Sequence, residues 1–126
     1  MKLRVLLVDD EEHLRRIAKL CLERVGGFHV VAVEGGEAAL SILEQEPFHV
    51  MLLDAMMPGM DGLTTLSRIR EREAGALLPV IFVTAKGGDA EIARFHAAGA
   101  LGVIEKPFDP MLLSRRVLEL LPASRP

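Results

Sequence analysis

Short apolar runs alternate with stretches of helical periodicity along most of the chain. Five runs have the length of a single β-strand: RVLLV at 4–8, FHVVAV at 28–33, HVMLL at 49–53, VIFVT at 80–84 and GVIEK at 102–106. Short, largely apolar runs rich in Val and Ile are typical of strands covered on both faces, as in a parallel sheet. The alternation therefore predicts an α/β domain with helices on the faces of a parallel sheet. The run at 28–33 is less uniformly apolar, which predicts an edge strand.

The stretches between the runs carry apolar residues at helical spacing. The positions expected to face the core are Leu14, Ile17, Ala18, Cys21 and Val25 in the first helix, Leu40 and Leu43 in the second, Leu63, Leu66 and Ile69 in the third, Ile92, Ala93 and Phe95 in the fourth, and Leu113, Val117 and Leu121 in the last. Three aspartates, Asp61, Asp89 and Asp109, predict helix N-caps, the last followed by Pro110 in the first turn. Two glycines at 26–27 predict the end of the first helix.

Length and composition fit one globular domain. We expect residues 1–121 to form that domain and residues 122–126 to be a tail or the start of a linker. The net charge of −3, with scattered basic residues, gives no electrostatic footprint for nucleic acid or an anionic membrane. No apolar stretch approaches the roughly 20 residues that cross a bilayer. The lone Cys21 cannot form an internal disulfide, and we expect a reducing, cytoplasmic location.

Polar residues stand where the apolar runs end. Asp9 and Asp10 follow the first run, Asp54 follows the third, and Thr84 and Lys106 close the fourth and fifth. The carboxyl ends of parallel strands form the rim at which open α/β sheets bind ligands. Three carboxylates, one hydroxyl and one ammonium are therefore expected at one rim. This composition predicts a site that binds a hard divalent cation and handles a phosphoryl group.

Each of these residues also has an ordinary structural role open to it. Acidic residues at a helix start are favoured by the helix dipole, and we assign Glu11 and Glu12 to that role. Thr84 suits a strand through its branched side chain, and Asp54 suits a turn cap before Met56. Because all members of the predicted site are present together, we favour the functional interpretation for Asp9, Asp10, Asp54, Thr84 and Lys106.

Four motifs in order, VDDEE, LLDAMMPGMDG, VTA and EKPF, stand at the ends of the predicted strands. Over nearly its whole length the chain resembles the receiver domain of bacterial two-component response regulators. The resemblance implies a flavodoxin-like, three-layer fold with a doubly wound, five-stranded parallel sheet in the order 2-1-3-4-5, which is the order of the chemotaxis members of the family.

The resemblance also implies a magnesium site and a phosphoryl acceptor. Asp54 is expected to accept the phosphoryl group as an aspartyl-phosphate. Asp10, Asp54 and the backbone carbonyl of Met56 are expected to ligate Mg²⁺, or Mn²⁺ in its place, with Asp9 acting mainly through water.

Lys106 and Thr84 complete the implied site. Lys106 is expected to pair with Asp54 at rest and with a phosphoryl oxygen after transfer. The Thr84 hydroxyl is expected to donate to a phosphoryl oxygen. The Lys106–Pro107 bond is expected to be cis. The resemblance implies that the domain catalyses only its own phosphorylation and dephosphorylation and has no other enzymatic activity.

The implied partners follow from the same resemblance. They are a sensor histidine kinase or a histidine phosphotransfer protein, and an unknown downstream effector or fused output domain. The switched surface is expected on the fourth helix, fifth strand and fifth helix, which is also the surface of an implied homodimer. Neither nucleic acid nor a membrane is an expected partner of this domain.

Three positions bear on how the implied switch works. Val103 stands where the family usually has Tyr or Phe, whose ring rotation reports phosphorylation, and valine has no ring to rotate. The expected switch is then a shift of the loop at 86–88 and of the fourth helix, led by Thr84. Met56 and Lys86 occupy positions that tune the lifetime of the phosphoryl group. Met56 cannot position an attacking water as an amide would, so we expect slow self-dephosphorylation.

Three alternatives remain at this point. A flavodoxin-type FMN carrier would need a Ser-, Thr- or Gly-rich phosphate loop in place of VDDEE, and usually aromatic residues around the flavin. A phosphatase of the haloacid dehalogenase type would open with two aspartates separated by one residue, whereas Asp9 and Asp10 are adjacent. A receiver-like scaffold that works without phosphorylation would typically have lost an acidic residue or Lys106.

Overall fold

The computed structural model describes residues 2–85 and 88–122. The elements along the chain are β1 (Arg4–Val8), α1 (Glu12–Arg24), β2 (His29–Val33), α2 (Gly36–Leu43), β3 (Val50–Asp54), α3 (Gly62–Arg70), β4 (Val80–Thr84), α4 (Asp89–Ala97), β5 (Gly102–Glu105) and α5 (Leu113–Leu120), with 3₁₀ turns η1 (Glu73–Gly75) and η2 (Pro110–Leu112). Strands and helices alternate as predicted. The expected loop shift at 86–88 and the tuning role of Lys86 lie largely outside the described residues.

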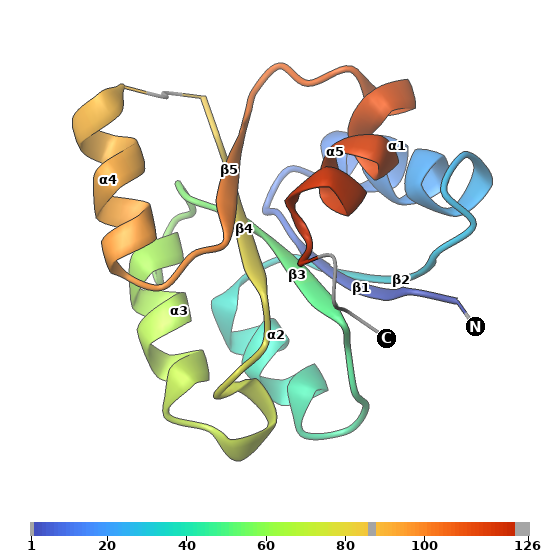
Figure 1. Ribbon diagram of the computed structural model, residues 1–126. Coiled ribbons are helices and arrows are strands. Elements are labelled where there is room, and N and C mark those ends of the chain that lie inside the picture. The colour runs from blue at the N-terminus through green and yellow to red at the C-terminus, as the bar shows by residue number, and fades with distance from the viewer. Residues whose placement is uncertain (1, 86–87, 123–126) are drawn as a thin grey trace.

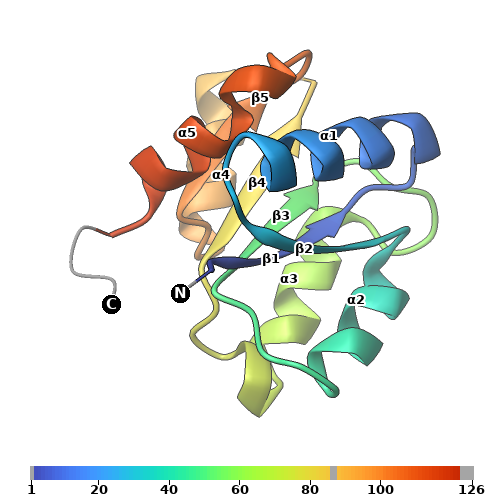
Figure 2. The ribbon, with the colours of Figure 1, turned by 90° about the vertical axis from the view of Figure 1, so that its right-hand side faces the viewer.

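All strands are parallel and form one five-stranded sheet in the order β2-β1-β3-β4-β5. Helices α1 and α5 cover one face of the sheet, and α2, α3 and α4 cover the other (Figures 1 and 2). The three-layer, flavodoxin-like fold is confirmed, and β2 lies at an edge as predicted. The strand order reverses direction at β1 and β3, so the loops that follow these two strands diverge around a crevice.

The two sheet faces have separate aliphatic cores because successive strand residues point to opposite sides. On β1, Leu6 and Val8 pack under α2 and α3, whereas Val5 and Leu7 pack under α1 and α5. Strands β3 and β4 are buried along their whole length. These strands thus hold their carboxyl ends in fixed positions.

Two predicted core positions on the helices are wrong. Val25 is 48% exposed because α1 ends at Arg24, and Leu22, one turn after Ala18, is fully buried in its stead. Ala93 is exposed, because Phe95 is the one residue of α4 that is buried against the rest of the domain.

The predicted helix ends are largely confirmed. The Asp61 side chain accepts from the Thr64 N–H and caps α3. Asp109 caps the 3₁₀ turn η2 before α5. Asp89 was expected as an N-cap, but Gly88 takes that position and Asp89 is the first helical residue, where its charge still suits the helix dipole. Gly27 has a φ of 71°, the left-handed conformation that ends many helices.

The predicted domain boundary falls after Leu121, the last buried residue within the described part of the chain. Leu121 is 6% exposed and packs with the α1–α5 core, and Pro122 is exposed. Residues 123–126 lie outside the described residues, so the assignment of 122–126 as a tail or linker stays a prediction.

Gly62, the first residue of α3, fixes the helix against the end of β3. A Cβ added there would lie 2.8 Å from the Asp54 carbonyl oxygen, the Ala55 Cα and the Phe82 ring. Two of these atoms are backbone and cannot move aside, so we expect Gly62→Ala to lower the free energy of unfolding by about 1–3 kcal/mol. Urea denaturation followed by circular dichroism measures the change. Gly35→Ser is the matched control, because a Cβ at Gly35 meets open space, and an unchanged midpoint for Gly62→Ala would contradict the packing.

Candidate functional site

The five predicted residues lie at the carboxyl ends of four strands. Asp9 and Asp10 follow β1, Asp54 is the last residue of β3, and Thr84 is the last residue of β4. Lys106 follows β5, and its N–H donates to the Thr84 carbonyl at 2.7 Å. The strand pairing that the apolar runs dictate therefore assembles the site.

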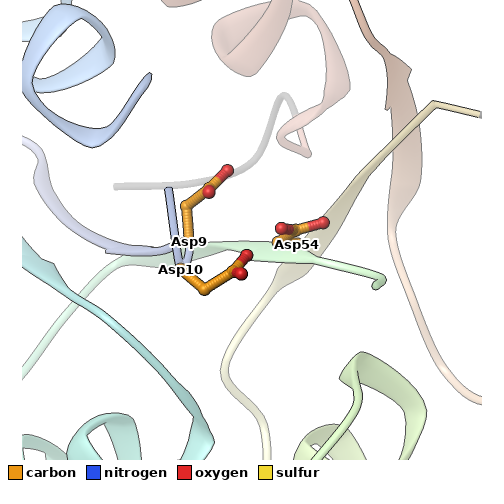
Figure 3. Close-up of side chains that lie close together, drawn as sticks. All are labelled: Asp9, Asp10 and Asp54. Carbon is orange, nitrogen blue, oxygen red and sulfur yellow. The ribbon is translucent and has the colours of Figure 1, made fainter. Parts of the chain in front are cut away.

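The three carboxylates form a compact cluster. One oxygen from each of Asp9, Asp10 and Asp54 lies within 4.8 Å of the others (Figure 3). Asp9 and Asp54 are 4% and 3% exposed, whereas Asp10 is exposed to solvent. Hard cations such as Mg²⁺ favour carboxylate oxygens and keep several waters, so a cluster open on one side fits that ion.

Lys106 lies between two of the carboxylates. Its Nζ is 3.3 Å from Asp54 Oδ2 and 3.3 Å from Asp9 Oδ2. The pair with Asp54 was expected from the resemblance, whereas the pair with Asp9 was not predicted. The cis Lys106–Pro107 bond is confirmed.

Burial sets the protonation behaviour of this pair. Desolvation raises the pKa of Asp54 to about 6, with a further contribution from the charge of Asp9, while the Met56 N–H and Lys106 act in the opposite direction. Burial alone would lower the pKa of Lys106, but the charges of Asp54 and Asp9 outweigh it and the pKa is raised. Without a cation, Asp54 is thus a strained carboxylate beside a firmly charged ammonium.

The loop with Asp9 and Asp10 is held by hydrogen bonds at Asp9. The Asp9 N–H donates to the Val33 carbonyl at 3.1 Å, and Asp9 Oδ1 accepts from the Glu11 N–H at 2.8 Å. The Asp9 carbonyl accepts from Arg15 Nη1 at 2.9 Å. Arg15 is not among the predicted site residues, although its position one turn into the helix after an acidic loop is a usable signal.

Met56 lies two residues after Asp54, and Thr84 ends the neighbouring strand β4. The Met56 N–H donates to Asp54 Oδ1 at 3.1 Å, and the Met56 side chain is 73% exposed. Thr84 is 1% exposed at the end of β4. The roles of the Met56 carbonyl as a metal ligand and of the Thr84 hydroxyl stay predictions.

The fold and the rim define a flavodoxin-like domain with a cluster of three carboxylates and one lysine at its switch point. Residues 5–118 match the family of the response regulator receiver domain, and the chain belongs to that family, which acts in two-component signalling. This membership sets aside the flavin-carrier and phosphatase alternatives. None of the described helices has the length and apolarity needed to span a bilayer.

Named relatives agree with this assignment. The chain is 37% identical over 118 residues to the transcriptional regulatory protein ResD of Bacillus subtilis, covering 94% of this chain and 48% of ResD, so it spans about half of that protein. It is 35% identical over 120 residues to a chemotaxis protein CheY homolog of Campylobacter jejuni, covering 94% of this chain and 92% of the relative. The solved chemotaxis response regulator CheY4 of Vibrio cholerae superposes with a TM-score of 0.89 at 26% identity, covering 96% of this chain and 100% of that one.

Proposed function

We propose that the chain is a phosphorylated switch in which Asp54 accepts a phosphoryl group in an Mg²⁺-dependent reaction. The observation that carries this proposal is the position of Asp54. It is almost fully buried at the end of β3, 3.3 Å from the Lys106 ammonium and within 4.8 Å of two more carboxylates. Such an arrangement has little value for stability, because buried like charges repel one another, but it suits binding of a cation and a phosphoryl group.

Each residue has a defined part in the proposed reaction. An ionised Asp54 oxygen attacks phosphorus in line, a P–O bond forms, and the P–N bond to the donor histidine breaks, leaving the imidazole with the electron pair. Lys106 then exchanges its contact with Asp54 for one with a phosphoryl oxygen, and Thr84 donates its hydroxyl to another. Bound Mg²⁺ would supply positive charge against the transferring group, held by Asp10, Asp54 and the Met56 carbonyl, with Asp9 acting mainly through water; Mn²⁺ would serve in its place.

The proposed partners follow from membership of the family. A sensor histidine kinase or a histidine phosphotransfer protein supplies the phosphoryl group. An effector or a fused output domain binds the surface of α4, β5 and α5 once phosphorylation has changed it. A homodimer would form through the same surface. We also propose that the protein acts in the cytoplasm. The domain has no other enzymatic activity in this view.

Incubation with acetyl phosphate tests the proposal. Intact mass should rise by one phosphoryl group in the presence of Mg²⁺ and stay unchanged with EDTA. The remaining alternative is a receiver-like scaffold that works without phosphorylation. A folded protein that binds Mg²⁺ but gains no mass from either acetyl phosphate or a panel of purified kinases would favour that alternative.

Met56 is expected to slow the loss of the phosphoryl group. Its 73% exposed thioether stands two residues after Asp54 and cannot hold an attacking water by a strong hydrogen bond. We expect Met56→Asn to shorten the half-life of the phosphorylated protein several-fold, measured as the decay of the phosphorylated mass after removal of acetyl phosphate. Met111→Asn, at another exposed methionine, is the control, and an unchanged half-life in Met56→Asn would contradict the role of Met56.

A further inference from the structure

Arg15 is the one described side chain that reaches the backbone of the β1–α1 loop from α1. Its Nη1 donates to the Asp9 carbonyl at 2.9 Å, and its own N–H donates to the Glu11 carbonyl at 2.9 Å. The Arg15 side chain is half-buried. Its partner is thus a carbonyl at the base of the loop, and no ion pair joins Arg15 to the carboxylates among the described residues.

The Asp9 carbonyl governs the direction of Asp10. The Asp9 carbonyl, the Asp10 N–H and the Asp10 Cα belong to one planar peptide unit. Holding the carbonyl therefore fixes the orientation of this unit, from which the Asp10 side chain projects. The Asp9 side chain is itself fixed by the Glu11 N–H and by Lys106. The exposed Asp10 carboxylate has no hydrogen bond or ion pair within the described ranges, so its aim depends on the backbone beneath it.

The positive charge of Arg15 and its hydrogen bond to the Asp9 carbonyl have separable effects on Mg²⁺ binding. A cation beside an acidic site repels Mg²⁺, so loss of the Arg15 charge alone would tighten binding. Loss of the hydrogen bond would release the peptide plane and leave Asp10 to be ordered when the ion binds, which weakens binding. The two effects have opposite signs.

We propose that Arg15 is a positioning residue of the metal site, which holds the Asp9 carbonyl so that Asp10 is aimed at the cation before it arrives. The inference rests on the proposed Mg²⁺ site and extends it to a residue that lies outside the ligand set. Arg15 also brings positive charge near the cluster without pairing with a carboxylate oxygen of Asp9, Asp10 or Asp54.

Mg²⁺ titration of three variants, followed by amide chemical shifts at constant ionic strength, tests the inference. We expect Arg15→Gln to weaken Mg²⁺ binding by about tenfold, the lower end of what loss of an outer-sphere partner costs. Arg16→Gln is the matched control, with the same charge change at an exposed neighbouring position, and should bind as tightly as wild type or slightly more tightly. Arg15→Lys keeps the charge and a donor of similar reach, and should recover part of the affinity.

A second readout is independent of the ion. In the metal-free protein, the amide resonances of Asp10 and Glu11 should shift in Arg15→Gln and stay in place in Arg16→Gln. Arg15→Gln that binds Mg²⁺ as tightly as wild type, or more tightly, would overturn the inference while leaving the proposed function intact. Wild-type protein that binds no Mg²⁺ would overturn both, and that failure is visible without any variant.

Discussion

Asp54→Asn should abolish the mass gain with acetyl phosphate and Mg²⁺. The amide is nearly the same size as the carboxylate, so the packing at the end of β3 is retained, but it lacks the nucleophilic oxygen that forms the acyl phosphate. Asp9 and Asp10 lie within reach of the same ion, yet Asp9 is bound to Glu11 and Lys106, and Asp10 follows a different strand. We therefore expect no transfer to a neighbouring carboxylate.

Asp61→Asn is the matched control for this variant. Asp61 lies in the loop and helix that follow Asp54, and its substitution removes the same charge while Asn can still cap α3. Its phosphorylation should equal that of wild type. A phosphoryl gain in Asp54→Asn, located by peptide mapping to another residue, would show that the acceptor has been misassigned.

In the metal-free protein, the contribution of Asp54 to stability should fall as the pH rises from about 4 to about 7. The pKa of Asp54 is about 6 in the folded state, against an ordinary value of 3.8 for an unburied aspartate, so the folded state binds this proton more tightly. The associated stability is present below pH 4 and is lost as the pH rises through 6, by at most about 3 kcal/mol. The raised pKa of Lys106 acts only at alkaline pH and does not enter this window.

Urea denaturation in EDTA at several pH values checks this prediction. Other carboxylates oppose the trend, such as Asp61, whose pKa is lowered mainly by the Thr64 N–H, so the informative quantity is the difference between Asp54→Asn and wild type. That difference should favour the variant increasingly from pH 4 to pH 7. Saturating Mg²⁺ should raise the stability of the wild-type protein but not that of Asp54→Asn, because the ion binds the folded state through Asp54. A difference that does not change with pH would show that Asp54 is not strained by burial.

Sequence patterns predicted the parts of this molecule that depend on local chemistry. The apolar runs gave the strands, and the polar residues that end them gave Asp9, Asp10, Asp54, Thr84 and Lys106, because strand ends of a parallel sheet share a rim. Contacts that depend on three-dimensional packing could not be predicted from these patterns.

The contact between Lys106 and Asp9 is of that kind, since it joins the ends of β1 and β5, two strands that are not neighbours in the sheet. The hydrogen bond from Arg15 to the Asp9 carbonyl depends on the angle at which α1 leaves the sheet. Burial of Leu22 rather than Val25 depended on where α1 ends, and element ends are the least certain part of any pattern.

Helix α4 is attached to the domain through a narrow contact. Phe95 is the single buried residue among its nine, and its ring stacks on Phe82 of β4 with centroids 4.4 Å apart. Helix α3, of the same length, buries Gly62, Thr65, Leu66 and Ile69. Burial of one aromatic side chain contributes about 2–3 kcal/mol, which is a fraction of the stability of a typical domain. We therefore expect α4 to open or shift in local fluctuations that leave the sheet folded, and we expect hydrogen bonds formed at the rim to change how often it does so.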